Sequence, residues 1–138
     1  MYEKGLTSFV KMSQNLQKAV AKRLELDYPL SVGGTRRDAY LSVLRQTGNT
    51  PAALIEPVLN KYEDWLLHVF FQINEGRQSG MAGPLPLTFS EIQSFITITA
   101  TELTPWEVET IKDMDRSYVQ EMYNQLHQES TGQNDNLS

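Results

Sequence analysis

The sequence contains no cysteine, and this absence excludes several kinds of protein at once. A disulfide-stabilised fold, a thiolate nucleophile and a cysteine-ligated zinc site all require thiols. No segment approaches the ~18 consecutive apolar residues that span a bilayer, and the first residues contain no apolar stretch typical of a secretory signal. We therefore expect a soluble protein that stays in the cytoplasm and has no membrane partner.

Histidine is also scarce, since the chain contains only His68 and His127. Neither has a second histidine at metal-ligand spacing, so we interpret both as structural residues. The segment Asp113-x-Asp115 begins like a calcium-binding loop, but Tyr118 stands where such a loop requires glycine. No serine lies in the G-x-S-x-G motif of a nucleophile elbow. We therefore expect no enzyme activity, no metal and no cofactor.

Charge is present, but it is distributed unevenly along the chain. Twelve basic and 17 acidic side chains give a net charge of -5. Residues 1–45 carry eight basic and four acidic side chains (+4), so residues 46–138 carry four basic and 13 acidic ones (-9). A basic first third is typical of a solvated helix face, of contact with an acidic partner or subunit, or of nucleic-acid binding. Its basic residues form no recognition helix, which argues against nucleic acid.

The length of 138 residues and the hydrophobic content of 40% fit one folded domain. Apolar residues recur at three- and four-residue steps over 6–26, which predicts an amphipathic helix. A second helix is predicted over 35–47 and a third, the expected core, over 57–75, with a short turn after Pro51 between them. The residues expected to face inward from the second helix are Ala39, Tyr40, Val43 and Leu44. The apolar stripe of the third consists of Leu59, Tyr62, Trp65, Leu66, Val69, Phe70 and Ile73.

Two capping boxes predict where two further helices begin. Thr88 and Glu91 form the first box, and Thr104 and Glu107 form the second. In such a box the threonine hydroxyl accepts a hydrogen bond from a first-turn amide, while the glutamate accepts one from the threonine amide. The first box also favours helix over strand for the β-branched stretch 96–101, for which the sequence offers no obvious partner strand.

The remaining segments complete an all-α prediction. Residues 76–87 contain three glycines and two prolines and are predicted to form a loop, and 130–138 is expected to be a disordered tail. We predict a compact bundle of five or six helices in a single domain over 1–129, with a mobile C-terminal tail. The basic N-terminal helix, 1–28, either packs on the acidic C-terminal helix or forms an appendage that reaches a neighbouring subunit. We expect the second arrangement.

The order of motifs over residues 50–125 resembles a known family. The stretches LTFSEI at 87–92, ELTPWEV at 102–108 and IKDMDRSY at 111–118 follow one another. This order is similar to that of small helical tail-module proteins of siphophages and prophages, of the tail-assembly-chaperone kind. Helix propensity alone does not readily explain the match at Trp106, Glu107, Asp115 and Tyr118.

The resemblance implies a non-enzymatic protein that works in the cytoplasm of the infected cell. Such chaperones hold the long tape-measure protein and deliver tail-tube subunits to it, so the implied partners are phage tail proteins. Self-association into a homo-oligomer is a further expectation. Two alternatives stay open: a structural subunit of the tail or neck that remains in the virion, and a small helical nucleic-acid-binding regulator.

An apolar groove that receives an amphipathic helix is the expected way for such a protein to bind its partner. The side chains expected to line this groove are Trp65, Phe70, Phe71, Phe89, Phe95, Trp106, Met114 and Met122. Phe70 and Phe71 lie about 100° apart on one helix and cannot both fill a narrow stripe, so we place Phe71 at an interface. The candidate partner-binding residues are Phe71, Phe70, Trp65, Trp106, Lys18, Lys22 and Arg23.

Overall fold

The computed structural model describes the backbone of residues 2–137 and the side chains of residues 8–128. The described part is all-α apart from one small hairpin, which confirms the predicted fold class. Its elements are α1 (Tyr2–Asp27), α2 (Arg36–Thr47), the 3₁₀ helix η1 (Ala52–Leu54), α3 (Lys61–Asn74), β1 (Ser79–Gly80), β2 (Gly83–Pro84), α4 (Phe89–Thr99) and α5 (Pro105–Leu137). Helix α5 extends through Leu137 and so into the predicted tail, 130–138, whose side chains lie outside the described ones; the disorder of this tail stays a prediction.

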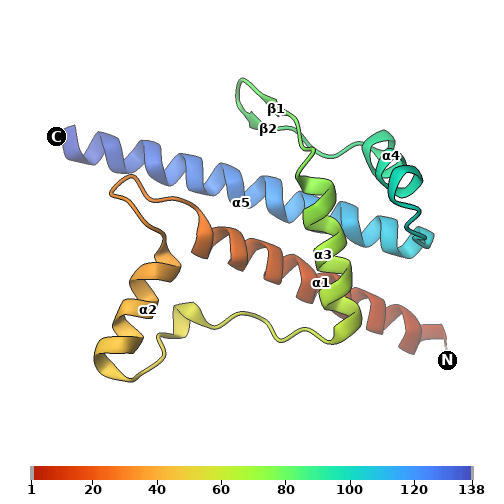
Figure 1. The fold of residues 1–138 in the computed structure, drawn as a ribbon, viewed down its shortest axis with the longest axis horizontal. Coiled ribbons are helices and arrows are strands. Elements are labelled where there is room, and N and C mark those ends of the chain that lie inside the picture. Colours follow the sequence, from red (N-terminus) through yellow and green to blue (C-terminus); the bar gives the residue numbers. More distant parts are fainter. Residues whose placement is uncertain (1, 138) are drawn as a thin grey trace.

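Helices α1 and α5 lie side by side and run in the same direction (Figure 1). Ser13 Oγ donates to Asp113 Oδ2 over 2.8 Å, and one turn further Ser117 Oγ donates to Gln17 Oε1 over 3.4 Å. The constant offset between the paired residues shows that the two helices are parallel and in register. The basic helix thus packs on the acidic helix of its own chain. This is the first of the two arrangements considered, whereas we expected the second.

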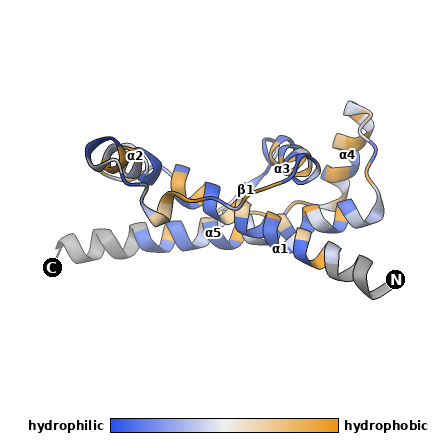
Figure 2. Ribbon diagram, turned by 90° about the horizontal axis from the view of Figure 1, so that it is seen from below, coloured by the Kyte–Doolittle hydropathy of each residue, from blue (hydrophilic) through white to orange (hydrophobic). Residues whose placement is uncertain are grey.

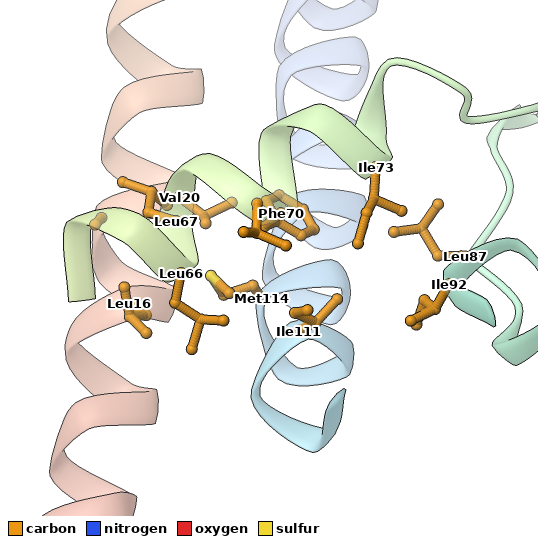
Figure 3. Packing of buried hydrophobic residues seen from close by; sticks show 12 residues of the cluster. Leu16, Val20, Leu66, Leu67, Phe70, Ile73, Leu87, Ile92, Ile111 and Met114 are labelled. Carbon is orange, nitrogen blue, oxygen red and sulfur yellow. The ribbon is translucent and has the colours of Figure 1, made fainter. Parts of the chain in front are cut away.

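The core forms where α3 crosses the α1–α5 pair (Figures 1 and 3). Leu66 and Phe70 of α3 are fully buried there, as are Leu16 of α1 and Met114 of α5. The cluster consists of Leu16, Ala19, Val20, Leu66, Leu67, Val69, Phe70, Ile73, Leu87, Ile92, Ile111 and Met114. Burying one such large side chain contributes about 1.5–3 kcal/mol. The apolar face of α1 therefore belongs to the main core, which explains why α1 packs on its own chain.

Helix α3 begins later than the sequence pattern predicts. The Asn60 side chain caps it by accepting from Glu63 N over 2.8 Å, while Glu63 Oε1 accepts from Asn60 N over 3.1 Å. The predicted apolar stripe was partly wrong, because Tyr62 and Trp65 are exposed and Leu67 is buried instead. The buried face of α3 is therefore rotated about the helix axis relative to the predicted stripe. As a result, the rings of Tyr62 and Trp65 lie at the surface.

Helix α2 has the predicted bounds but not the predicted inward face. Thr35 caps its start through a capping box with Asp38, and Gly48 ends it with a φ of 73°. None of its residues is buried, so the expectation that Ala39 and Val43 point into a core is wrong. α2, α3 and α4 all lie on one side of the α1–α5 layer, and α2 stands apart from the other two (Figure 2).

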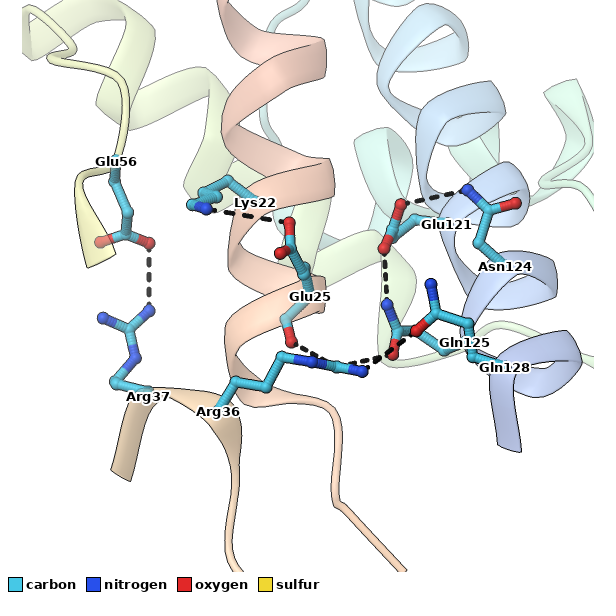
Figure 4. A network of polar contacts seen from close by, with 9 residues as sticks. All are labelled: Lys22, Glu25, Arg36, Arg37, Glu56, Glu121, Asn124, Gln125 and Gln128. Atoms are coloured by element: carbon cyan, nitrogen blue, oxygen red, sulfur yellow. Dashed lines mark hydrogen bonds and ion pairs between the residues drawn. The ribbon is translucent and has the colours of Figure 1, made fainter. Parts of the chain in front are cut away.

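Two arginines at the start of α2 hold it to the α1–α5 pair (Figure 4). Arg36 donates to the carbonyl oxygen of Glu25 over 3.1 Å and to Gln125 Oε1 over 2.7 Å. Arg37 pairs with Asp27 of α1 at 2.7 Å and with Glu56, just after η1, at 3.0 Å. α2 is therefore positioned by polar contacts at its base rather than by apolar burial.

The predicted loop 76–87 contains the antiparallel hairpin of β1 and β2, which the sequence did not predict. α4 follows and is helical through Thr99, so helix rather than strand is the correct assignment for most of 96–101. At the two predicted helix starts, Thr88 Oγ1 accepts from Glu91 N over 3.1 Å, and Thr104 Oγ1 accepts from Glu107 N over 3.2 Å.

Candidate functional site

Helix α3 separates the exposed candidate residues into two groups. Trp65 and Trp106 lie among residues near the starts of α1, α3 and α5, whereas Phe71 and Arg23 lie beside later residues of α1 and α5. Since α1 and α5 run in parallel, early residues lie on one side of the α3 crossing and late residues lie on the other. We call the first group the aromatic surface and the second the Arg23 pocket.

The aromatic surface consists of Phe9, Tyr62, Trp65 and Trp106. The rings of Phe9 and Trp106 lie 5.6 Å apart between centroids, and those of Tyr62 and Trp65 lie 6.0 Å apart. Their exposed fractions are 36% for Phe9, 43% for Tyr62, 39% for Trp65 and 51% for Trp106. Because exposed apolar patches are typical of interaction sites, these four rings are the candidates for a binding surface.

A hydrogen bond joins the two ring pairs. The Tyr62 hydroxyl donates to Glu107 Oε2 over 2.6 Å, and Glu107 follows Trp106 directly in the chain. The other oxygen of Glu107 accepts from Thr104 N over 2.7 Å, so this carboxylate serves both the helix cap and the aromatic surface. The bond joins residues 45 positions apart in the sequence and connects the start of α3, which carries Trp65, to the start of α5, which carries Trp106.

The two partners change each other's proton affinity. Burial raises the pKa of Tyr62 to about 12, with a further contribution from the hydrogen bond to Glu107. Burial also opposes ionisation of Glu107, but hydrogen bonds from Thr104 and Tyr62 outweigh it, and the pKa of Glu107 falls below its ordinary value of 4.5. Glu107 is therefore ionised and Tyr62 protonated over the whole physiological pH range, which keeps the bond intact.

The Arg23 pocket is an open cavity of about 400 Å³ on the other side of α3. The Arg23 guanidinium carbon lies 5.0 Å from the centroid of the Phe71 ring, within the range of a cation–π contact. The apolar lining consists of Leu24, Pro29, Phe71, Tyr118 and Met122. The structure thus brings together two of the candidates, Arg23 and Phe71, with Met122 of the expected groove.

Arg23 differs from the basic residues near it in having no acidic partner. Lys22 lies 3.8 Å from Glu25, and Asp27, which also lines the pocket, gives its oxygens to Arg37. Among the side chains that the structure describes, no carboxylate pairs with Arg23. Carboxylates nevertheless lie in its surroundings, since Asp27 lines the same pocket and Arg23 also borders a hollow of about 200 Å³ that Glu56 and Asp64 line.

The other candidates take different positions. Phe70 is fully buried in the core and is not part of either surface, which corrects its selection as a contact residue. Its neighbour Phe71 is partly exposed and meets it edge-on, with ring centroids 5.3 Å apart. Lys18 is exposed and lines an open, polar hollow of about 610 Å³ beside Asn60 and Glu63. Lys22 is partly buried in its pair with Glu25.

No motif or spacing in the sequence indicated a role for Arg77. Arg77 forms an ion pair with Asp115 at 2.5 Å, and the two side chains are only 6% and 2% exposed. The second oxygen of Asp115 accepts from Leu87 N over 3.0 Å, and Arg77 also covers the Tyr118 ring at 4.4 Å. This cluster ties the hairpin segment to α5 beside the Arg23 pocket. It gives a structural reason for Asp115 and Tyr118, which helix propensity left unexplained.

Other kinds of site find no support in the described residues. No group of three or more histidine, aspartate or glutamate side chains within residues 8–128 is placed to hold a metal ion. Within the described range, every helix is too short or too polar to cross a bilayer.

Comparison with known proteins places the chain in a family. The sequence profile described as phage tail assembly chaperone matches residues 43–120, which is more than half of the 138 residues. The chain belongs to the phage tail assembly chaperone family. The resemblance predicted from the sequence is thereby confirmed, and a role in phage tail assembly follows from it. No curated protein and no solved structure matches the chain.

The matched range contains only part of each surface of this chaperone. Trp65, Trp106 and Phe71 lie within 43–120, as does the ion pair of Arg77 and Asp115. Phe9 and Arg23 lie outside it, on α1. The family segment thus supplies α3, the hairpin, α4 and the first half of α5, while α1 adds Phe9 and Arg23 and the later part of α5 adds Met122.

Proposed function

We propose that this chaperone binds an apolar helical segment of the tape-measure protein or the tail-tube protein in the cytoplasm of the infected cell and holds it until the tail assembles. The aromatic surface is the proposed docking site. A tape-measure protein is long, helical and apolar along one face, so it requires a cover before assembly. The proposed mode of binding is therefore an amphipathic helix laid against apolar side chains.

The observation that supports this proposal most strongly is the exposure of Trp65 and Trp106 on one surface. Tryptophan and tyrosine are enriched among the residues that dominate binding energy at protein interfaces. Their rings bury a large area and lose little conformational entropy on binding. The hydrogen bond between Tyr62 and Glu107 fixes the surface before the partner arrives, which lowers the entropic cost of binding further.

A holding role requires no chemistry at a reactive centre. The proposed chaperone acts by binding and release alone, and its specificity comes from the shape and charge of the apolar surface. Glu109, which is exposed three positions after Trp106, favours a partner helix with a basic residue beside its apolar face.

Coexpression with the tape-measure and tail-tube proteins, followed by affinity capture, tests the proposal. We expect a complex with at least one of them. Trp106→Ala should reduce the affinity by roughly 30-fold, as expected for a central interface residue. The control is Met81→Ala, which removes a fully exposed apolar side chain at the hairpin tip and should leave the affinity unchanged. Absence of any complex, or equal affinities of the two variants, would contradict the proposal.

Mass spectrometry of purified virions separates the chaperone from the structural alternative. A chaperone that releases its partner should be missing from the finished particle. Stoichiometric retention in the tail or neck would favour a structural subunit instead.

A further inference from the structure

We propose that α2 and η1 form a hinged arm, residues 35–54, which opens and closes over the last turn of α1 while α1, α3 and α5 stay folded. In the closed position, which the structure shows, two arginines clamp the start of the arm and Leu26 is buried beneath it. In the open position Leu26 is exposed. The arm is thus a conformational device that uncovers apolar surface at the end of α1 when its clamp is released. It does not depend on which tail protein the aromatic surface holds.

The hinged arm has no apolar anchor in the core. All side chains of residues 35–54 are described, and none of them is buried. Helix α3, by contrast, buries Leu66 and Phe70 completely in the main cluster. Apolar burial is the main source of stability, and segments that bury little apolar surface open at a lower free energy than the core. The arm therefore opens more readily than α3 does.

Both ends of the arm suit a hinge. Gly33 and Gly34 precede it with φ values of 97° and 69°, a conformation that glycine adopts at little cost. A Cβ atom added at Gly33 would meet nothing within 4 Å, so this turn is not restrained by packing. The other end leads into the stretch 55–59, where Ile55 is 64% and Val58 91% exposed. A rotation at these two ends displaces few packed atoms, as hinge motions require.

The two arginines of the clamp hold the arm closed (Figure 4). Arg37 pairs with Asp27, which precedes the first hinge, and with Glu56, which follows η1, so it restrains both ends. Arg36 connects the arm to the Gln125 side chain of α5. The side chain of Arg37 is 29% exposed, and those of its two partners are 47% and 37% exposed. Water competes for such partly exposed ion pairs, so the clamp is weaker than the core.

Leu26 lies where the arm meets α1. It is fully buried, yet it is not part of the main cluster. Arg36 donates to the carbonyl oxygen of Glu25, and Arg37 pairs with Asp27, so the start of the arm contacts both chain neighbours of Leu26. The burial of Leu26 therefore reports on the position of the arm.

The absence of cysteine from the chain allows a test with single introduced thiols. Leu26→Cys places a thiol beneath the arm, and the matched variant Leu66→Cys replaces an equally buried leucine of α3. Dithionitrobenzoate reacts only with an exposed thiol, so the reaction rate in native buffer measures how often each site opens. Leu26→Cys should react at least roughly tenfold faster than Leu66→Cys. Equal rates would show that the arm opens only with the whole fold and would overturn the proposal.

Adding Arg37→Ala to each cysteine variant tests the clamp. It removes two ion pairs and should raise the reaction rate of Leu26→Cys roughly fivefold, while the rate of Leu66→Cys stays the same. Arg45→Ala is the matched control and should change neither rate. Arg45 is an exposed arginine of the same helix, and it forms no ion pair with any described side chain. Equal effects of Arg37→Ala and Arg45→Ala on Leu26→Cys would overturn the proposal.

Hydrogen exchange gives the same test without a substitution in the core, and it decides the question if a cysteine variant does not fold. Relative to their intrinsic rates, amides of residues 40–47 in α2 should exchange at least roughly tenfold faster than those of 66–73 in α3. Arg37→Ala should accelerate only the amides of α2. Equal protection of the two helices, or acceleration of both together, would overturn the proposal. These experiments use the chain alone, so a failed capture of a tail protein leaves their outcome unaffected.

Discussion

The two sides of α3 differ in shape, in charge and in how they are built. The aromatic surface exposes four rings around one hydrogen bond, from Tyr62 to Glu107. The Arg23 pocket is concave, holds one unpaired arginine, and lies beside the ion pair of Arg77 and Asp115. An open aromatic surface suits a long apolar helix, whereas a small charged pocket suits a single side chain. One fold thus carries two surfaces that differ in shape and composition.

Deleting residues 1–28 should have the largest effect, because it removes part of both sides together. α1 supplies Phe9 to the aromatic surface and Arg23 to the pocket, and its Leu16, Val20 and Leu26 are fully buried. Losing three such side chains removes about 5–9 kcal/mol of burial, comparable to the whole stability of a typical domain. We expect the far-ultraviolet circular dichroism melt to lose its cooperative transition. A cooperative melt with changed oligomeric size would instead show that α1 is an appendage.

Alanine substitutions at Phe70 and Phe71 should differ in their cost to stability, because only Phe70 is fully buried. Phe70→Ala leaves a cavity in the centre of the core and should lower the free energy of unfolding by about 3–5 kcal/mol. Phe71→Ala removes a partly exposed ring and should cost clearly less. Urea titration of both variants measures the difference. Equal losses of stability would show that Phe71 belongs to the core.

Asp115→Ala should destabilise the pocket side of α3 by about 3–5 kcal/mol, since it leaves the buried charge of Arg77 without a partner. Arg116→Ala is the matched control, because it breaks the exposed pair of Arg116 and Asp113 and should cost at most about 1 kcal/mol. Hydrogen exchange should show faster exchange in the hairpin of Asp115→Ala. A loss no greater than that of the control would mean that the ion pair does not hold the hairpin.

Tyr62→Phe should have the smallest effect, about 1 kcal/mol at neutral pH, because the lost hydroxyl is only partly buried. Since the pKa of Glu107 is lowered in the folded state, this stabilisation is present above the ordinary value of 4.5 and is lost as the pH falls through the lowered pKa. The difference in Tm between the wild type and Tyr62→Phe should therefore shrink on acidification. A difference that stays constant across this range would contradict the proposed role of the Tyr62–Glu107 bond.

Local signals in the sequence predicted most of the helices. Thr35 at the start of α2 and Gly48 at its end predicted the bounds of that helix. The capping box at Thr88 predicted helix rather than strand for the β-branched stretch of α4. These signals work because they depend on hydrogen bonds within one turn. The sequence pattern predicted too early a start for α3, because the apolar residues before its cap, Asn60, fit a helical pattern.

Contacts between distant segments were not predictable in the same way. Periodicity placed Tyr62 and Trp65 in the stripe of α3, but the crossing over α1 and α5 buries Leu67 instead. Arg77 lies in a loop of glycine and proline, and nothing nearby in the sequence indicates a partner at Asp115. The Arg23 pocket likewise forms only because three helices meet there.

Fluorine NMR of the chaperone labelled with fluorotryptophan gives the most direct test of the aromatic surface as the docking site. The chain contains two tryptophans, so it should give two resonances, from Trp65 and Trp106. When unlabelled tape-measure or tail-tube protein binds, both resonances should shift and lose their sensitivity to solvent. A complex that forms while both resonances stay unchanged would show that the tail protein binds elsewhere.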